Sequence, residues 1–293
     1  MLVTMKEILD RASRENYAVA APNVSNELNA RASIEAAEDM QAPLILDVAY
    51  RAAVDILFLG DMLRKLAEQT SIPVAINLDH GSSLNEVQMA IRAGFTSVMI
   101  DRSSCSEQEN VRDVSEVVRV AHAVGISVEA ELGHVGRADQ YDRDRDAALT
   151  DPQAAKRFVE QTGIDCLAVA VGTAHGAYPK EFVPYLDFER LVRIKEATEH
   201  FPLVLHGSSG TDNESLRKAC QLGINKVNIN TDLVWATIHA VQATEFHNRN
   251  AFLFYPTIQR GFCDKLKEMI EVYGSAGKAW NPDCTRRLPR QRF

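Results

Sequence analysis

The sequence predicts an α/β protein: a single-domain (β/α)8 TIM barrel with extra C-terminal helices. Short runs rich in Val, Ile and Ala recur along the 293 residues, and a polar, helix-compatible stretch follows each run. Runs this short and this apolar are typical of strands buried on both faces of a parallel sheet. About eight such strand–helix units close into one barrel more readily than they divide into two domains.

The candidate strands lie at 18–24, 43–49, 73–79, 96–101, 126–132, 165–171, 202–206 and 225–230. Among the helices between them, DNESLRKACQLG begins at an Asp212 or Asn213 cap and ends at Gly223. AVDILFLGDML is expected to cover the barrel, with a subunit contact as the alternative, and residues 231–275 are expected to be helical. An open doubly wound sheet would need a glycine-rich dinucleotide turn after an early strand, and the sequence has none.

Composition narrows the classes of partner. The net charge is -8 and no long basic run precedes the final residues, which disfavours nucleic acid. No apolar run approaches the roughly 20 residues that cross a bilayer, and the N-terminus lacks a signal-peptide pattern. Five scattered cysteines without a CxxC pair predict reduced thiols. We therefore expect a cytoplasmic protein with one domain over 1–279 and a basic, flexible tail at 280–293.

Three histidines follow candidate strands at the rim where barrels place their active sites. His80, His175 and His206 come just after the third, sixth and seventh strands. One such histidine would more often cap a strand or pack against a neighbour. Three at equivalent positions favour a catalytic zinc site, in which three protein ligands leave one coordination position open. His134 is the rival ligand near this rim.

Carboxylates stand at the same strand ends. Asp79 precedes His80, and where the backbone turns at a strand end both side chains can reach the cavity, so Asp79 is suited to proton transfer. Glu131 is expected either to ligate the metal or to orient a histidine. Glu129, in phase with Glu131, would face the barrel interior and require a partner. For Asp101 a structural role between loops competes with a catalytic one.

Two polar segments near the last strands indicate a phosphate site. The sequence GSSG follows the seventh strand and NINT ends the eighth, where barrels often bind phosphate through backbone N–H groups. Ser209 and Thr231 would add hydroxyl donors. GSSG alone is more often a turn, but its position after His206 favours the phosphate site.

The segment 133–150 interrupts the regular alternation of strands and helices. It is long and charged, which predicts a mobile active-site lid, with an ordinary solvated loop as the alternative.

The segments INLDHGSS, SVMIDRS, VEAELGHVG, TGIDCLAVAVGTAHGAY, PLVLHGSSG, KVNINTDL and YGSAGKA appear in order over about residues 1–279. Together they resemble the class II fructose-bisphosphate and tagatose-bisphosphate aldolases, and are most similar to the tagatose-bisphosphate branch.

The resemblance implies that His80, His175 and His206 hold one catalytic Zn²⁺. It implies that Asp79 exchanges a proton with an oxygen of the aldehyde half. It also implies a cradle for dihydroxyacetone phosphate, formed by Gly176, Gly207, Ser208, Ser209, Asn228, Ile229, Asn230 and Thr231. A monovalent cation near that phosphate is a further candidate ligand, and a homodimer or homotetramer is expected.

The sequence departs from the family pattern in the loop after the fifth strand. The family carries a GGxED-like stretch there, and here Arg137 replaces the second glycine. Asp139 is the candidate for the loop acid that handles the substrate's carbon proton, with Asp142 or Asp144 as substitutes. No arginine identified in the sequence would bind a second phosphate. The alternatives to an aldolase are a metal-dependent sugar-phosphate epimerase or isomerase and a non-catalytic sugar-phosphate binder.

Overall fold

The computed structural model describes residues 1–136, 149–176 and 184–280, and all eight candidate strands occur in it. They form one parallel sheet in the order β1-β8-β7-β6-β5-β4-β3-β2. The strands are β1 Val19–Pro22, β2 Leu44–Ala49, β3 Val74–Gly81, β4 Ser97–Ile100, β5 Ser127–Leu132, β6 Cys166–Val169, β7 Leu203–Leu205 and β8 Ile224–Ile229.

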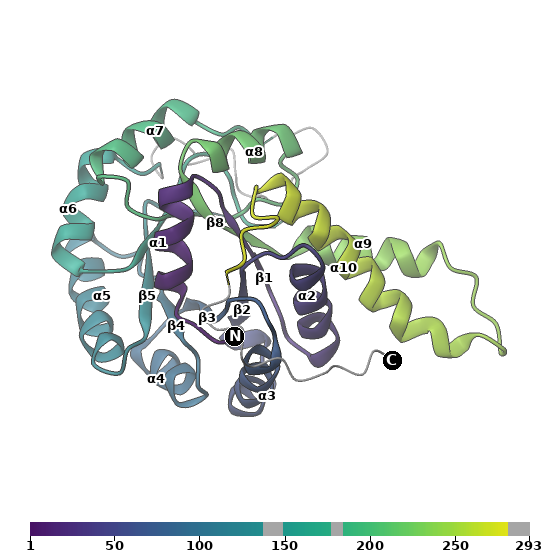
Figure 1. Cartoon of the computed structure of the whole chain (residues 1–293). Helices are drawn as coiled ribbons and strands as arrows, with labels where there is room; N and C mark the ends of the chain where they lie inside the picture. The colour runs from purple at the N-terminus through teal and green to yellow at the C-terminus, as the bar shows by residue number, and fades with distance from the viewer. Residues whose placement is uncertain (137–148, 177–183, 281–293) are drawn as a thin grey trace.

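The sheet closes on itself between its first two strands. A parallel bridge joins Asn23 to Asp47, and the Val24 N–H donates to the Asp47 carbonyl over 2.8 Å. Each of the first seven strands is followed by a helix that covers the outside of the sheet (Figure 1). The predicted (β/α)8 barrel is therefore confirmed.

The covering helices begin and end where local signals place them. Asp212 caps the N-terminus of α8, and its carboxylate accepts a hydrogen bond from the Ser215 N–H over 2.8 Å. Gly223 follows the C-terminal cap residue of this helix and has a φ of 123°. The helices are α2 Glu27–Asp39, α3 Ile56–Gln69, α4 Leu84–Arg92, α5 Glu107–His122, α6 Pro152–Thr162, α7 Phe188–Ala197 and α8 Asn213–Gln221. In α3, Leu59 and Leu63 are buried, so this segment packs on the barrel as expected.

The barrel interior changes from apolar to polar along its axis. At the strand starts, Ile45, Ala75 and Met99 form an apolar layer. The helix α1 (Met5–Glu15) closes this end, because its buried residues, among them Met5 and Leu9, belong to the same cluster. Further along the strands, the buried interior residues are polar, and they include Asp47, Asn77, Glu129 and Lys226. The apolar layer and α1 thus fill the end of the barrel at which the strands begin.

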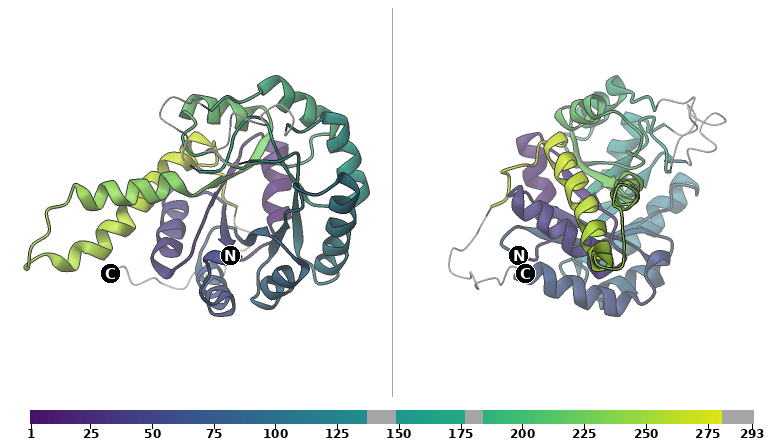
Figure 2. Two further views of the ribbon diagram at one scale, coloured as in Figure 1. Left: turned by 180° about the vertical axis from the view of Figure 1, so that it is seen from behind. Right: turned by 90° about the vertical axis from the view of Figure 1, so that its right-hand side faces the viewer.

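Two further helices leave the barrel as an arm. After β8 the chain forms α9 (Thr231–Gln242), the short η3 helix (Ala251–Leu253) and α10 (Phe254–Val272), which returns to pack on α9 and α2. The arm projects well beyond the barrel wall (Figures 1 and 2). No helix in the described ranges is long and apolar enough to cross a membrane. Except for Trp280, the predicted tail lies outside the described residues.

Candidate active site

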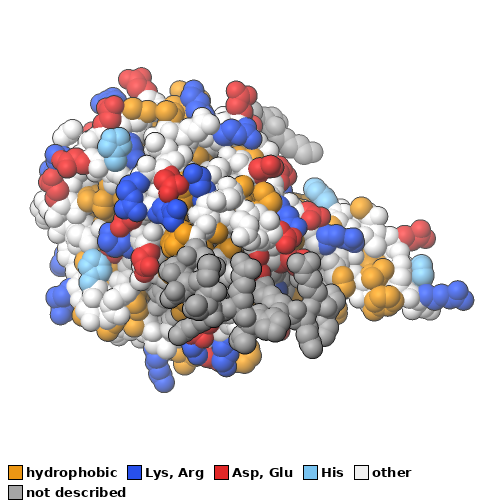
Figure 3. Space-filling view, in the orientation of Figure 1, with side chains coloured by type: hydrophobic (Ala, Val, Ile, Leu, Met, Phe, Trp, Pro, Cys, Tyr) orange, Lys and Arg blue, Asp and Glu red, His pale blue; other side chains and the backbone are white. Residues whose placement is uncertain are grey.

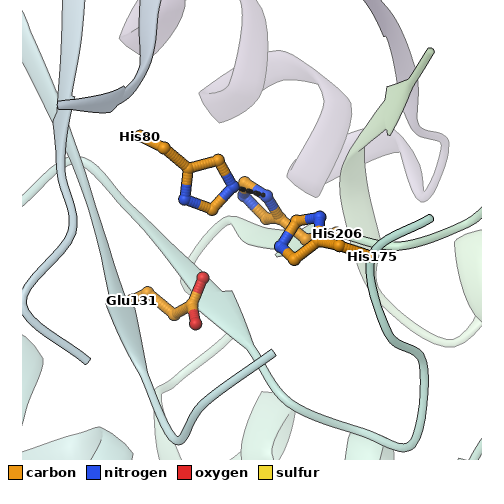
Figure 4. A group of neighbouring side chains, drawn as sticks. All are labelled: His80, Glu131, His175 and His206. Carbon is orange, nitrogen blue, oxygen red and sulfur yellow. Dashed lines mark hydrogen bonds between the residues drawn. The ribbon is translucent and has the colours of Figure 1, made fainter. Parts of the chain in front are cut away.

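The three predicted histidine ligands converge at the C-terminal rim. His80 at the end of β3, His175 after β6 and His206 after β7 lie with their ring centroids 4.7 to 5.6 Å apart. Glu131 of β5 joins them, and one potential ligand atom from each of the four residues lies within 4.8 Å of the others (Figure 4). Side chains separated by up to 126 residues in the chain thus share one small volume.

Backbone geometry explains how these side chains reach the same point. His80 adopts a left-handed conformation with φ of 50°, so it turns toward the cavity directly after Asp79 instead of to the opposite face. Gly207 follows His206 with φ of 67°, and a Cβ there would lie 2.5 Å from the backbone of Ala174. The loops after β6 and β7 can therefore approach closely only with glycine at this position.

His80 and His206 each have one ring nitrogen within hydrogen-bond distance of a different carboxylate. His80 Nδ1 lies 2.9 Å from Asp101 Oδ2, and His206 Nε2 lies 2.8 Å from Glu129 Oε1. Such contacts fix the orientation and tautomer of metal-binding imidazoles. His80 Nε2 and His206 Nδ1 are left 3.0 Å apart. Asp101 thus contacts His80 as well as Ser103 of its own loop.

These side chains suit a divalent cation. His175 Nε2 is buried without a hydrogen-bond partner among the described residues, as is Glu131 Oε2. Burial, together with the nearby His206 and His80, lowers the pKa of His175 to about 3, so its ring is neutral and offers a lone pair. Burial opposes charge on His80, but Asp79, Asp101 and Glu131 raise its pKa to about 10. The surroundings of His80 therefore favour the positive charge that a metal ion carries.

Glu131 and His134 differ in their place at the site. Burial, and then the charge of Asp101, raises the pKa of Glu131 to about 8, and its Oε1 accepts from the Val135 N–H over 2.9 Å. His134 is half-exposed and its Nδ1 contacts Ser103 Oγ at 3.0 Å. His134 is not part of the cluster of potential ligand atoms.

Asp79 lies beside the histidines and is held by two amides. Asn23 Nδ2 donates to its Oδ2 over 2.8 Å, and Asn228 Nδ2 donates to its Oδ1 over 3.0 Å. Burial alone would raise the pKa of Asp79, but His80, His206 and Lys226 lower it to about 2. Asp79 is therefore an ionised and oriented carboxylate, which can accept a proton.

Lys226 is fully buried in the barrel interior and contacts both Glu129, the partner of His206, and Asn228, the partner of Asp79. Its Nζ donates to Glu129 Oε2 over 2.9 Å and to Asn228 Oδ1 over 2.7 Å. Nζ also lies 3.1 Å from Asp47 Oδ2. Burial opposes its charge, yet Asp47 and Glu129 raise the pKa of Lys226, so it stays cationic. Because Lys226 occupies the amide oxygen of Asn228, the amide nitrogen must face Asp79.

The expected phosphate cradle lies on the β7 and β8 side of the rim. Gly176 has φ of 95° and an open space at its Cβ position, while Ser209 is buried beside Gly207. Ser208 Oγ donates to the Asn228 carbonyl over 2.7 Å, which commits this hydroxyl to the fold. Ile229 is buried at the end of β8, whereas Asn230 is exposed and caps α9, whose first residue is Thr231.

The candidate loop acids Asp139, Asp142 and Asp144 fall outside the described residues, as does most of the predicted lid. Sequence reasoning missed Lys226 and Asn23. A signal for Lys226 was present, because it is a charged residue within the apolar strand NKVNIN, two positions before Asn228 and thus on the same face. Asn23 is the last residue but one of the first candidate strand, but nothing in the sequence indicated which residue it contacts.

A parallel barrel with a histidine cluster and buried carboxylates at its C-terminal rim is an arrangement typical of metal-dependent barrel enzymes. The family model "Fructose-bisphosphate aldolase class-II" matches residues 3–278. A fructose-bisphosphate aldolase of Thermus caldophilus is 40% identical, over 95% of this chain and 100% of the relative. One of Geobacillus stearothermophilus is 41% identical, over 95% of this chain and 99% of the relative.

A solved structure that this chain resembles is also an aldolase, like the sequence relatives. The YdjI aldolase from Escherichia coli K12 superposes with a TM-score of 0.84 and 34% identity, covering 96% of this chain and 100% of that chain. The chain belongs to the class II fructose-bisphosphate aldolase family, and it is therefore an aldolase. The family assignment does not separate the fructose-bisphosphate from the tagatose-bisphosphate branch.

Proposed function

We propose that this aldolase depends on zinc and reversibly cleaves a ketose 1-phosphate or 1,6-bisphosphate. The products are dihydroxyacetone phosphate and an aldehyde. The observation that carries the proposal is the convergence of His80, His175 and His206 beside an ionised Asp79. An aldol cleavage needs a group that removes a hydroxyl proton and a centre that stabilises negative charge on the ketose oxygens.

In this proposal His80, His175 and His206 hold the zinc ion, which supplies Lewis-acid stabilisation of the ketose oxygens. Asp79 removes the proton from the hydroxyl of the aldehyde half during cleavage and returns it during condensation. Asn23 and Asn228 hold the Asp79 carboxylate in place for this transfer. The backbone around Gly207 and Ser209 binds the phosphate and so fixes the reacting carbons. Asp139 is the proposed acid for the carbon proton.

The test is cleavage of fructose 1,6-bisphosphate and tagatose 1,6-bisphosphate before and after dialysis against a chelator. Activity should disappear on dialysis and return with Zn²⁺. Full activity in protein shown to be free of metal would refute the mechanism. Trapping the released aldehyde separates an aldolase from an epimerase or isomerase, because isomerisation gives no second product. Binding of dihydroxyacetone phosphate without exchange of its carbon proton would instead indicate a sugar-phosphate binder.

We also propose that two copies associate through the arm formed by α9 and α10. Of the residues in α9, only Leu233 is buried, although the helix is largely apolar. The arm exposes Val234, Trp235, Phe252, Leu253, Phe254 and Tyr255. Hydrophobic side chains are visible along it in Figure 3. Exposed apolar surface of this kind on a projecting element is typical of a subunit contact.

A further inference from the structure

The helix α3 carries a second row of apolar side chains beside the face that packs on the barrel. Leu59 and Leu63 are its buried core residues, whereas Phe58, Met62 and Leu66 recur at every fourth position on a neighbouring face. Phe58 is 73% exposed, and Met62 and Leu66 are only half-buried. A surface helix normally has polar residues at such positions, so this row, the α3 stripe, indicates a binding surface.

The α3 stripe lies in a groove between α3 and α2, two neighbouring helices of the barrel wall (Figure 1). The groove has a volume of about 290 Å³, and its lining includes Arg31 of α2 and Phe58, Asp61, Met62, Leu66 and Gln69 of α3. From Phe58 to Gln69 the helix rises by about 16 Å. Because α3 ends at Gln69, just before β3, the groove extends to the closed end of the barrel.

The chain leaves its described part beside this end of the groove. The Ala279 N–H donates to the Gln41 carbonyl over 2.8 Å, in the turn after α2. The Gln41 side chain donates to the Glu38 carbonyl over 2.6 Å, and the Glu38 carboxylate accepts from the Thr70 hydroxyl. Thr70 directly follows Gln69 of the groove. The residues after Ala279 therefore start next to the groove and not on the far side of the barrel.

These residues are long enough and have suitable side chains to follow the groove. Beyond Trp280, residues 281–293 read NPDCTRRLPRQRF, with four arginines, one acid and the apolar Leu288. Pro282 and Pro289 disfavour a helix, and in an extended form the segment reaches about 40 Å, which exceeds the length of the groove. The family model ends at residue 278, so this segment lies beyond the part that matches the aldolase family.

The charges of the groove and of the segment are opposite. The helices α2 and α3, with the α3 cap Asp55, carry seven acidic and three basic residues. Asp61 lines the groove, and the Asp55 carboxylate accepts from the Phe58 N–H over 3.0 Å, so an acid stands at the start of the α3 stripe. A basic segment with an apolar residue matches both the charge and the apolar floor of this surface.

We propose that residues 281–293 bind in the groove between α2 and α3 of the same copy. Leu288 packs against the α3 stripe, and the arginines lie beside the acids along it. The segment thereby removes from water an apolar surface that the barrel leaves exposed. This contact lies on the outer wall of the barrel, so it does not depend on the metal or on the substrate.

The test measures the mobility of residue 291 in the full-length protein by electron paramagnetic resonance of a nitroxide attached to Gln291→Cys. Cys105→Ser and Cys284→Ser remove the competing thiols, and the other described cysteines are buried. The unchanged groove should give a dominant slow component. Phe58→Lys removes an apolar contact and repels the arginines, so the ratio of slow to fast label should fall about 10- to 100-fold. Arg286→Gln with Arg287→Gln should lower it by less, about 2- to 10-fold.

Val124→Lys is the matched control, because Val124 is an exposed apolar residue just after α5, away from the groove. Its ratio should equal that of the unchanged protein. A slow component that survives Phe58→Lys, or a fast label in the unchanged protein, would overturn the proposal. A slow fraction that rises with protein concentration would assign the groove to a second copy and exclude binding within one copy.

Discussion

Lys226 Nζ lies 2.9 Å from Glu129 Oε2 at a point where both side chains are fully buried. Glu129 in turn holds His206, and Lys226 also holds Asn228, so one ammonium group supports both a proposed metal ligand and the amide that orients Asp79. Burial alone would raise the pKa of Glu129, but Lys226 and His206 outweigh it and lower the pKa below its usual value. The pair is thus a charged one.

Replacing Lys226 with Met should leave Glu129 and Asp47 without their cation. Breaking a buried ion pair in this way costs about 3–5 kcal/mol. The free energy of unfolding, measured by urea denaturation of the metal-free protein, should fall by this order. Zinc affinity should fall as well, because His206 loses its fixed partner. Lys195→Met is the matched control: Lys195 is also buried, but among the described residues its Nζ contacts neutral oxygens, those of Ser13, Phe201 and Asn225. Equal losses of zinc affinity in the two variants would contradict this account.

Asp79→Ala should separate chemistry from metal binding. Asp79 is not among the clustered potential ligands, so zinc content measured by atomic spectrometry should stay at that of the unchanged enzyme. Loss of a general acid–base group lowers kcat about 10²- to 10⁴-fold. Asp61→Ala, which removes an exposed acid of α3 paired with Arg64 and Lys65, should retain full activity. A variant lacking Asp79 with unchanged kcat would exclude this residue as the base.

Asp101→Asn should weaken zinc binding through His80. The carboxylate lies 2.9 Å from His80 Nδ1, and partners of this kind contribute about 10- to 100-fold to metal affinity. Competition with a chromophoric chelator measures the effect. His134→Gln is the comparison, since His134 contacts the same Ser103 but lies outside the cluster. Zinc affinity that changes equally in both variants would count against an orienting role for Asp101.

The buried Lys195 should make the free energy of unfolding increase as the pH rises above about 7. Burial lowers its pKa from 10.5 to about 7. Between about pH 7 and pH 10.5 the unfolded chain then binds more protons than the folded one, so the contribution of Lys195 to the free energy of unfolding increases with pH, by at most about 1.4 kcal/mol per unit. Below about pH 7 both states are protonated and the full penalty applies. Subtracting the pH profile of Lys195→Met from that of the unchanged protein isolates this slope, and a flat difference would show that the three oxygen contacts offset burial.

Trp235→Glu should dissociate the proposed assembly. Trp235 is half-exposed on the arm, and a buried carboxylate at a subunit contact is unfavourable. Sedimentation velocity should then show a shift toward monomer. Val124→Glu removes an exposed apolar residue beyond α5, away from the arm, and should leave the sedimentation coefficient unchanged. An unaltered assembly in the Trp235 variant would remove the arm as the contact.

The sequence predicted the eight strands and the convergence of histidines for the same reason. Strands buried on both faces are continuous apolar runs, and residues at the ends of parallel strands meet at one rim. The partners of buried polar groups are not encoded locally. Lys226 on β8 contacts Glu129 on β5, and Asn23, just after β1, contacts Asp79 on β3. Both pairs therefore depend on the register of the strands and on the closure of the barrel. The projection of the arm was equally hidden, because an apolar helix such as α9 normally predicts burial.

The interior ion pair also constrains the order in which the chain can fold. Glu129 on β5 and Lys226 on β8 are 97 residues apart, and Asp47 lies on β2. A nascent chain that has left the ribosome only as far as β7 contains both acids without their cation, and enclosing them in an apolar interior at that stage is unfavourable. Stable closure must therefore await the last strand, and folding intermediates should keep the centre of the barrel hydrated until β8 inserts.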